Sequence, residues 1–175
     1  MDKTLKIGIQ GVKGSFHDMA AREYFHKDVA LVECNSFRKL CDRLSHSHCD
    51  FALMAIENSL AGSILPNYAL LETNKLKIIG EIYQKIVMNI MALPGESLAT
   101  IKTVQSHPMA LLQCSNFLSR HPSIEVKEGN DTAESAKEIK EKGLTGAAAI
   151  APKLAAELYG MEILAEGIVL IMRGL

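Results

Sequence analysis

Apolar and polar residues form short alternating blocks along the first third of the chain. These blocks predict strands at residues 5–10, 30–34 and 51–56 and helices at 15–26 and 36–44. Ser36 is the predicted N-cap of the second helix, and the third strand is continuously apolar, which is typical of a buried strand. Strands and helices that alternate in this way predict a parallel sheet with right-handed crossovers and helices on its faces.

The rest of the chain predicts a connecting region and then a second alternating set that begins at residue 101. A helix at 65–72 leads into residues 76–93, which predict one very long strand or two consecutive strands, and a loop follows at 94–99. The remaining blocks predict strands at 101–105, 124–128, 147–150 and 163–168 and helices at 108–119, 132–142 and 152–159. Local signals support these boundaries: Asp131 and Glu134 form a capping box, Gly143 occupies the C′ position, and Pro152 suits the first helical position.

The two sets of blocks predict an α/β protein with two α/β lobes and a cleft between them. Residues 1–80 are assigned to the first lobe and 81–162 to the second, and a strand within 163–175 is expected to lead back to the first lobe. Ligands of open α/β sheets bind outside the carboxyl ends of the strands. The site is therefore expected at those ends.

The net charge and the apolar runs of the sequence argue against nucleic acid and membranes as partners. The net charge is −1 with both signs interspersed, so a basic face that could bind nucleic acid is not expected. The first residues lack an apolar stretch long enough for a signal peptide, and the apolar run at 86–93 is too short to span a bilayer. These features predict a cytoplasmic protein without membrane contact.

The four cysteines show no CxxC pair, a pattern that fits reduced thiols. Cys41, His46, His48 and Cys49 fall close together in the sequence, yet they lack the two spaced pairs of a zinc site. A helix end with exposed histidines is expected there, and no metal.

Four segments follow predicted strands and open predicted helices: 11–15, 57–62, 106–108 and 131–133. Helix N-termini present N–H groups and partial positive charge, so several of them around one site would hold an anion, above all one with two carboxylates. Hydroxyl donors accompany them at Ser15, Ser59, Ser106 and Thr132. Each of these residues is also a good cap or turn former, which is the alternative explanation for its presence.

Four further polar residues have competing interpretations. Glu57 and Asn58 follow a strand that is predicted to be buried, where a carboxylate and an amide are costly unless a partner pairs with them. Gln113 lies seven residues after Ser106 and therefore on the same helical face, although a solvent-facing amide is the ordinary expectation. His107 could be a general acid or a histidine packed beside Pro108, and packing is the favoured interpretation.

Five ordered motifs resemble the prephenate dehydratase family. They are Gly11-Val12-Lys13-Gly14-Ser15-Phe16, Ala55-Ile56-Glu57-Asn58-Ser59 with Gly62, Ser106-His107-Pro108 with Gln113, Asp131-Thr132-Ala133, and Ala148 to Ala151 with Tyr159 and Gly160. A proline commonly stands in the family where this chain has Ala55. The combination is specific because the motifs keep their order from position 11 to position 164.

The resemblance implies a fold like that of type 2 periplasmic solute-binding proteins and prephenate, a dicarboxylate, as substrate. The implied reaction is a decarboxylating dehydration to phenylpyruvate that needs positioning and electrostatic assistance and no cofactor. By resemblance, catalytic roles are expected for Glu57, Asn58, Ser106 and Gln113. Substrate-binding roles are expected for Gly14, Ser15, Ser59, Gly62, His107, Asp131, Thr132 and Ala133.

The chain departs from the family pattern after residue 168. In the family a polar stretch and then threonine, arginine and phenylalanine follow the last strand, and the threonine is assigned to catalysis. Here residues 169–175 are mainly apolar, and no threonine follows Thr145. The expectation is a chain that binds prephenate but turns it over poorly or not at all, that lacks the family's phenylalanine-sensing domain, and that forms a homodimer.

Three alternatives remain. A dinucleotide-binding domain would use Glu33 after the second strand, although the glycines at 8, 11 and 14 do not form GxGxxG. A non-catalytic module that binds a small anion would share the architecture and need no threonine. An arogenate dehydratase would act on the aminated analogue of prephenate.

Overall fold

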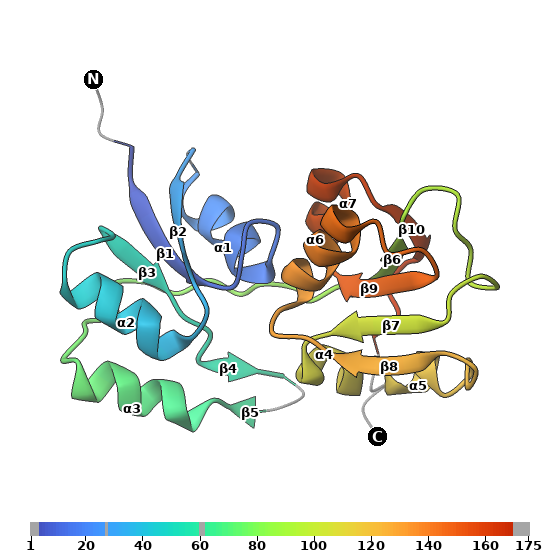
Figure 1. Cartoon of the computed structure of the whole chain (residues 1–175). Coiled ribbons are helices and arrows are strands. Elements are labelled where there is room, and N and C mark those ends of the chain that lie inside the picture. The colour runs from blue at the N-terminus through green and yellow to red at the C-terminus, as the bar shows by residue number, and fades with distance from the viewer. Residues whose placement is uncertain (1–3, 27, 60–61, 170–175) are drawn as a thin grey trace. The chain divides into compact units, whose positions relative to one another are not determined.

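The computed structural model describes residues 4–26, 28–59 and 62–169, and the chain divides into two units, residues 1–84 and 85–175. Each unit contains a β-sheet covered by helices (Figure 1). The predicted α/β class is therefore confirmed.

The first unit begins with a parallel sheet. Its elements are β1 (Lys6–Gln10), α1 (Phe16–Phe25), β2 (Ala30–Cys34), α2 (Phe37–Ser45), β3 (Phe51–Leu53), β4 (Glu57–Asn58), β5 (Gly62–Ser63) and α3 (Leu65–Thr73). The strand order is β2-β1-β3, and β1 runs parallel to both neighbours, as the alternating blocks predicted. A separate antiparallel hairpin joins β4 to β5.

Helices α1 and α2 cover opposite faces of the first sheet because side chains alternate along β1. Ile7 and Ile9 are fully buried and pack with Ala21 of α1. Gly8 points the other way, and a Cβ built on it would lie 2.6 Å from Leu40 Cδ1 of α2 and 2.9 Å from Cys49 Sγ. Glycine at this position therefore lets α2 approach the strand closely.

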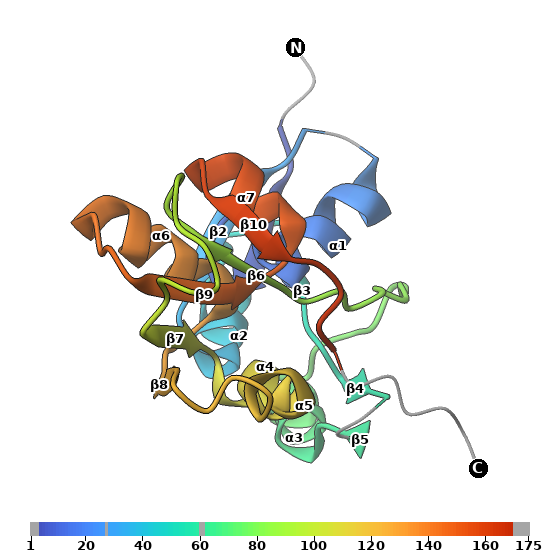
Figure 2. The same ribbon diagram turned by 90° about the vertical axis from the view of Figure 1, so that its right-hand side faces the viewer.

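The second unit holds a mixed sheet. Its elements are β6 (Asn89–Ala92), β7 (Thr103–Ser106), α4 (Pro108–Gln113), α5 (Ser115–Leu118), β8 (Glu125–Glu128), α6 (Thr132–Lys142), β9 (Ala147–Ala151), α7 (Lys153–Tyr159) and β10 (Glu162–Ala165). The order is β10-β6-β9-β7-β8, with β7, β8 and β9 parallel and β6 antiparallel to both of its neighbours. Figure 2 shows α6 and α7 on one face and α4 and α5 on the other.

The strand predicted at 163–168 is β10, which pairs with β6 inside the second unit. Just beyond it, Asn89 Oδ1 accepts from Gly167 N at 3.2 Å, and Ile168 N donates to the Met88 carbonyl at 3.0 Å. Residues 170–175, where the chain was expected to continue toward the first lobe, lie outside the described residues.

Several predicted boundaries were wrong. Residues 76–93 contain one four-residue strand, β6, where one long or two consecutive strands were predicted. The helix predicted at 108–119 is interrupted at Cys114, which caps α4 and precedes α5. Pro152 is the N-cap of α7 and not its first residue. Strand β3 is half-buried where a buried strand was predicted. Across the described ranges, every helix is too short or too polar to cross a membrane.

Candidate functional site

The predicted site residues fall into one group in each unit. Gly14, Ser15, Glu57, Asn58, Ser59 and Gly62 belong to the first unit, and Ser106, His107, Gln113, Asp131, Thr132 and Ala133 belong to the second. Gly14, Ser15, Ser106 and His107 lie at or just beyond the carboxyl ends of β1 and β7, whereas Glu57, Asn58 and Gly62 belong to the β4–β5 hairpin and Gln113 ends α4. Whether the two groups face one cleft stays a prediction.

The turn between β1 and α1 already uses its backbone amides within the chain. Gly11 N donates to the Cys34 carbonyl at 2.8 Å, and Lys13 N donates to Glu33 Oε1 at 2.7 Å. Gly14 N donates to Asp18 Oδ2 at 2.8 Å. An incoming carboxylate would have to displace these acceptors. Since Glu33 already accepts from the turn, the dinucleotide alternative also loses the carboxylate that it needed for a ribose.

Asp18 organises the same turn from inside α1. Its side chain is fully buried, and its second oxygen, Oδ1, lies 2.6 Å from Arg22 Nε. Ser15 is the N-cap of α1, as the sequence suggested, and its Oγ accepts from Asp18 N at 3.3 Å. The hydroxyl hydrogen of Ser15 therefore remains the donor that this cap can offer to a ligand.

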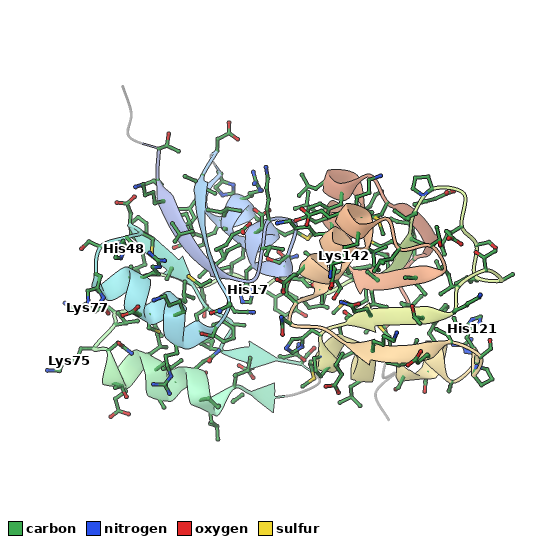
Figure 3. All side chains as sticks on the ribbon, viewed as in Figure 1. His17, His48, Lys75, Lys77, His121 and Lys142 are labelled. Carbon is green, nitrogen blue, oxygen red and sulfur yellow. The ribbon has the colours of Figure 1, made fainter. Side chains whose placement is uncertain are left out.

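His17 is the second residue of α1, which follows the turn after β1 (Figure 3). Its ring meets Phe37 edge-on with centroids 5.5 Å apart. Burial lowers the pKa of His17 to about 4, and a hydrogen bond to the Gln10 backbone opposes that shift. Nε2 is buried and has no hydrogen-bond partner within the described part of the chain. The neutral imidazole is thus the stable form in this environment.

The hairpin β4–β5 carries the second motif. Glu57 is exposed and Asn58 is half-buried, and they pair with Ser63 and Gly62 of β5. The burial argument for Glu57 was therefore wrong, because the carboxylate is in contact with water and needs no buried partner. Ser59 and Gly62 are exposed on either side of residues 60–61, which lie outside the described residues.

Ser106 ends β7 and is fully buried. Its hydroxyl donates to the Ile150 carbonyl of β9 at 2.6 Å. The expectation that Ser106 offers a hydroxyl donor is not met in this arrangement, because its hydrogen is used inside the sheet. Its oxygen can still accept a bond from a ligand.

We expect Ser106→Ala to lower the free energy of unfolding by about 1–3 kcal/mol, since the buried Ile150 carbonyl would lose its side-chain donor. Urea unfolding followed by circular dichroism measures the change. Ser119→Ala removes a similar bond, 3.1 Å to the Asn116 carbonyl, from an exposed site and is the matched control. Equal effects of the two substitutions would contradict the structural role of Ser106.

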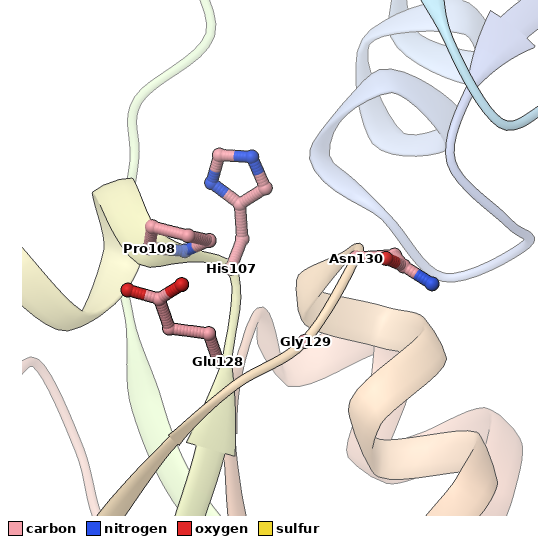
Figure 4. Close-up of a pocket in the computed structure, with 5 residues that line it drawn as sticks. All are labelled: His107, Pro108, Glu128, Gly129 and Asn130. Carbon is pink, nitrogen blue, oxygen red and sulfur yellow. The ribbon is translucent and has the colours of Figure 1, made fainter.

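His107 and the turn after β8 line an open pocket in the second unit. Its residues are His107, Pro108, Glu128, Gly129 and Asn130, and its volume is about 420 Å³ (Figure 4). His107 Nδ1 accepts from Met109 N at 3.2 Å, so the neutral ring carries its proton on Nε2. His107 is thereby the exposed N-cap of α4, so the packing interpretation was wrong, and its role as a general acid stays a prediction.

Asp131 lies next to this pocket as the N-cap of α6. Its Oδ1 accepts from Ala133 N at 2.9 Å and from Glu134 N at 3.0 Å. Burial raises the pKa of Asp131 despite these two donors, and the nearby His107 pulls it in the opposite direction. The amides of Ala133 and Glu134 are thus already satisfied, and Thr132, the first residue of α6, is buried.

Gln113 is buried and not solvent-facing, with 6% of its surface exposed. Ser106 is the last residue of β7 and does not belong to α4, so the helical spacing that predicted one shared face does not apply, although both residues are buried. A buried amide can orient a ligand more firmly than an exposed one, because its rotamer is fixed by packing.

The cysteines and histidines between residues 41 and 49 differ in their burial. Cys41 and Cys49 are buried, whereas His46 and His48 are exposed, as expected for a helix end. Within residues 4–26, 28–59 and 62–169, no group of three or more His, Cys, Asp or Glu side chains is placed to hold a metal ion. All four cysteines are free, and burial raises the pKa of Cys114 to about 12.

Sequence reasoning missed four polar residues next to the predicted groups: Asp18, Asn67, Glu128 and Asn130. Asp18 could have been noticed as the acid three residues after the Ser15 cap, in the first turn of α1. Asn67 gave no such signal, because an asparagine early in a helix is an ordinary polar residue.

A family model described as "Prephenate dehydratase" matches residues 7–171. Among proteins with assigned functions, arogenate dehydratase 5 of Arabidopsis thaliana is 37% identical over 166 residues, which cover 94% of this chain and 39% of that protein. The chain spans 39–42% of the length of such relatives.

Two solved structures are similar to the chain over 94% of its length, each with a TM-score of 0.81. One is a prephenate dehydratase from Arthrobacter aurescens in complex with L-Phe, 29% identical and covered over 56% of its chain. The other is GqqA, described as a novel type of quorum-quenching acylase, 30% identical and covered over 59%.

Proposed function

Because the chain belongs to the prephenate dehydratase family, we propose that it binds prephenate and converts it to phenylpyruvate by decarboxylating dehydration. The observation that carries the proposal is the family match, which runs from residue 7 to residue 171 and so includes all the predicted site segments. Arogenate is the second candidate substrate, because relatives are named arogenate dehydratases.

The proposed reaction couples a decarboxylation to the loss of water. The ring carboxylate leaves as carbon dioxide, the ring hydroxyl leaves as water after taking up a proton, and the ring becomes aromatic. The protein has to orient the substrate and assist the departure of the hydroxyl group. Asn58, Ser106 and Gln113 are the residues proposed to orient it, with Glu57 beside the leaving group. If turnover proves fast, His107 is the first residue proposed to assist, because its Nε2–H is not used in the cap and can donate a hydrogen bond to the departing hydroxyl group.

Prephenate is expected to raise the melting temperature of the chain, because a ligand that binds only the folded state stabilises it by mass action. A thermal-shift titration with prephenate and with arogenate measures both affinities. Asn58→Ala should weaken binding roughly 10-fold, while Asn116→Ala, on the exposed surface of α5, is the matched control. No stabilisation by either compound would refute the proposal.

A turnover assay for phenylpyruvate separates enzyme from binding module. Stabilisation by prephenate without product would support the alternative of a non-catalytic anion-binding protein. The expected slow turnover depends on the departure from the family pattern after residue 168, most of which lies outside the described residues. Turnover as fast as that of other family members would contradict the expectation and would make His107→Gln the next variant to assay.

The acylase description of one structural relative has less support in this chain. A serine nucleophile needs a base that accepts its proton. Ser106 and His107 are adjacent, but Ser106 donates to the Ile150 carbonyl and His107 Nδ1 accepts from Met109 N. This pair therefore lacks the hydrogen bond that would activate the serine, and we favour the dehydratase.

We also propose that the protein is a cytoplasmic homodimer. The four free and buried cysteines fit a reducing compartment, where thiols persist. Size-exclusion chromatography with light scattering measures the oligomeric state directly.

A further inference from the structure

Two backbone carbonyls of the segment that leads into Glu57 and Asn58 accept hydrogen bonds from α3 and its N-cap. Residues 54–56 connect β3 to β4 without belonging to either strand. The Ala55 carbonyl accepts from Asn67 Nδ2 at 2.6 Å, and the Ile56 carbonyl accepts from Ile64 N at 2.9 Å. Glu57 and Asn58 themselves pair with Ser63 and Gly62 in the short β4–β5 ladder.

Asn67 is well placed to act as a fixed support. It is the third residue of α3, directly after Leu65 and Pro66, and 3% of its surface is exposed. Its own backbone N donates to the Ile64 carbonyl at 2.9 Å, so the first turn of α3 is tied to the end of β5. Figure 1 shows α3 beginning where β5 ends. The side chain therefore reaches from a helix to an irregular strand connection across twelve residues of sequence.

We propose that Asn67 is a positioning residue for Glu57 and Asn58. The hydrogen bond from Asn67 to the Ala55 carbonyl fixes the orientation of the peptide bond that follows Ala55. The orientation of this peptide bond sets the direction in which the chain continues from β3 into β4. An apolar residue at 67 would leave that carbonyl without its donor, and the connection could then rotate. The proposal rests on the function proposed above, in which Glu57 and Asn58 meet the substrate.

The structure offers a matched control in the same helix. Asn74, the C-cap of α3, donates from Nδ2 to the Leu70 carbonyl at 2.8 Å, so it makes the same kind of bond at the other end of the helix. Asn74→Ala removes an amide-to-carbonyl bond without touching residues 55–58. Asn67→Asp keeps the shape of the side chain, but at pH 8 the carboxylate cannot donate to Ala55 and repels its carbonyl oxygen.

Prephenate titrations of the full chain test the proposal. Asn67→Ala and Asn67→Asp should each bind prephenate roughly 10-fold more weakly than the parent, while Asn74→Ala should bind like the parent. The two Asn67 variants should have the same affinity for prephenate even though their melting temperatures differ. A purely structural role of Asn67 would instead make the affinity fall with the melting temperature. Parent-like affinity in both Asn67 variants would overturn the proposal.

A second measurement keeps the proposal separate from the proposed function. The side-chain amide signals of Asn58 in a nitrogen-15 NMR spectrum should shift in both Asn67 variants and stay in place in Asn74→Ala, with or without substrate. If the parent chain does not bind prephenate, the proposed function fails and this spectrum alone decides the role of Asn67. Unmoved Asn58 signals in folded Asn67→Asp would refute the positioning role even if prephenate binds.

Discussion

Asp18→Ala is expected to destabilise the first unit by about 3 kcal/mol, the largest effect of any substitution considered. The buried carboxylate accepts from Gly14 N at 2.8 Å and lies 2.6 Å from Arg22 Nε. Its loss would leave a buried amide without an acceptor and a cation without its partner. Because about a third of the Arg22 side chain is exposed, water would relieve part of the second cost.

Two further substitutions separate the contributions of Asp18. Asp18→Asn keeps an acceptor for Gly14 N but removes the charge, so its loss of stability should be smaller than that of Asp18→Ala. Asp42→Ala removes an exposed carboxylate that pairs with Lys39 at 2.9 Å on α2, and it should change stability little. Urea unfolding of the three variants provides the comparison. An Asp18→Ala protein as stable as Asp42→Ala would show that the buried Asp18 carboxylate does not stabilise the first unit.

Lowering the pH from 7 to 4 is expected to cost the folded chain about 3 kcal/mol through His17 alone. Burial lowers its pKa in the folded state from 6.5 to about 4. Between these values the unfolded chain takes up a proton that the folded chain does not. The stabilisation is therefore complete above pH 6.5, falls as the pH drops toward 4, and changes no further below that.

The contribution of His17 is measured as a difference between proteins, since other groups titrate in the same range. His17→Asn, which keeps an N–H near the Gln10 backbone, should lose less stability than the parent between pH 7 and pH 4. His48→Asn removes an exposed histidine from the same unit as a control. Identical pH profiles for the parent and His17→Asn would show that the imidazole is not the responsible group.

The regular parts of the fold could be predicted because their local signals agreed with the tertiary structure. Residues 30–34 and 132–142 were predicted to the residue, and Ser36, Asp131 and Gly143 cap the helices as expected. In the α6 region, cap, helix period and terminal glycine all indicated the same boundaries.

The connection between the units could not be predicted from hydrophobicity. Residues 81–88 alternate between exposed and less exposed side chains, which is the pattern of a strand, yet Tyr83 is 83% exposed and the chain here forms no ladder in the described structure. A period of two shows that a segment is extended, but pairing requires a neighbour at the right distance, which composition does not encode.

The positions of the candidate site residues were predicted better than their hydrogen bonds. The caps at Ser15 and Asp131 were identified, but not that Asp18 and Glu33 already accept from backbone amides of the turn between β1 and α1. Glu33 belongs to β2, a different element from that turn, so its distance to Lys13 N depends on tertiary packing. Likewise, nothing local indicated that the Ser106 hydroxyl donates to β9.

The strand order of the second unit also sets a sequence of events during synthesis. The three strands of the first sheet lie within residues 6–53, so that sheet can assemble early from segments close together in the chain. Strand β6 emerges before any of its neighbours, and both of them, β9 and β10, lie at residues 147–165. A nascent chain therefore exposes the apolar residues of β6 until nearly all of the second unit has left the ribosome, and this interval is when chaperones would matter most.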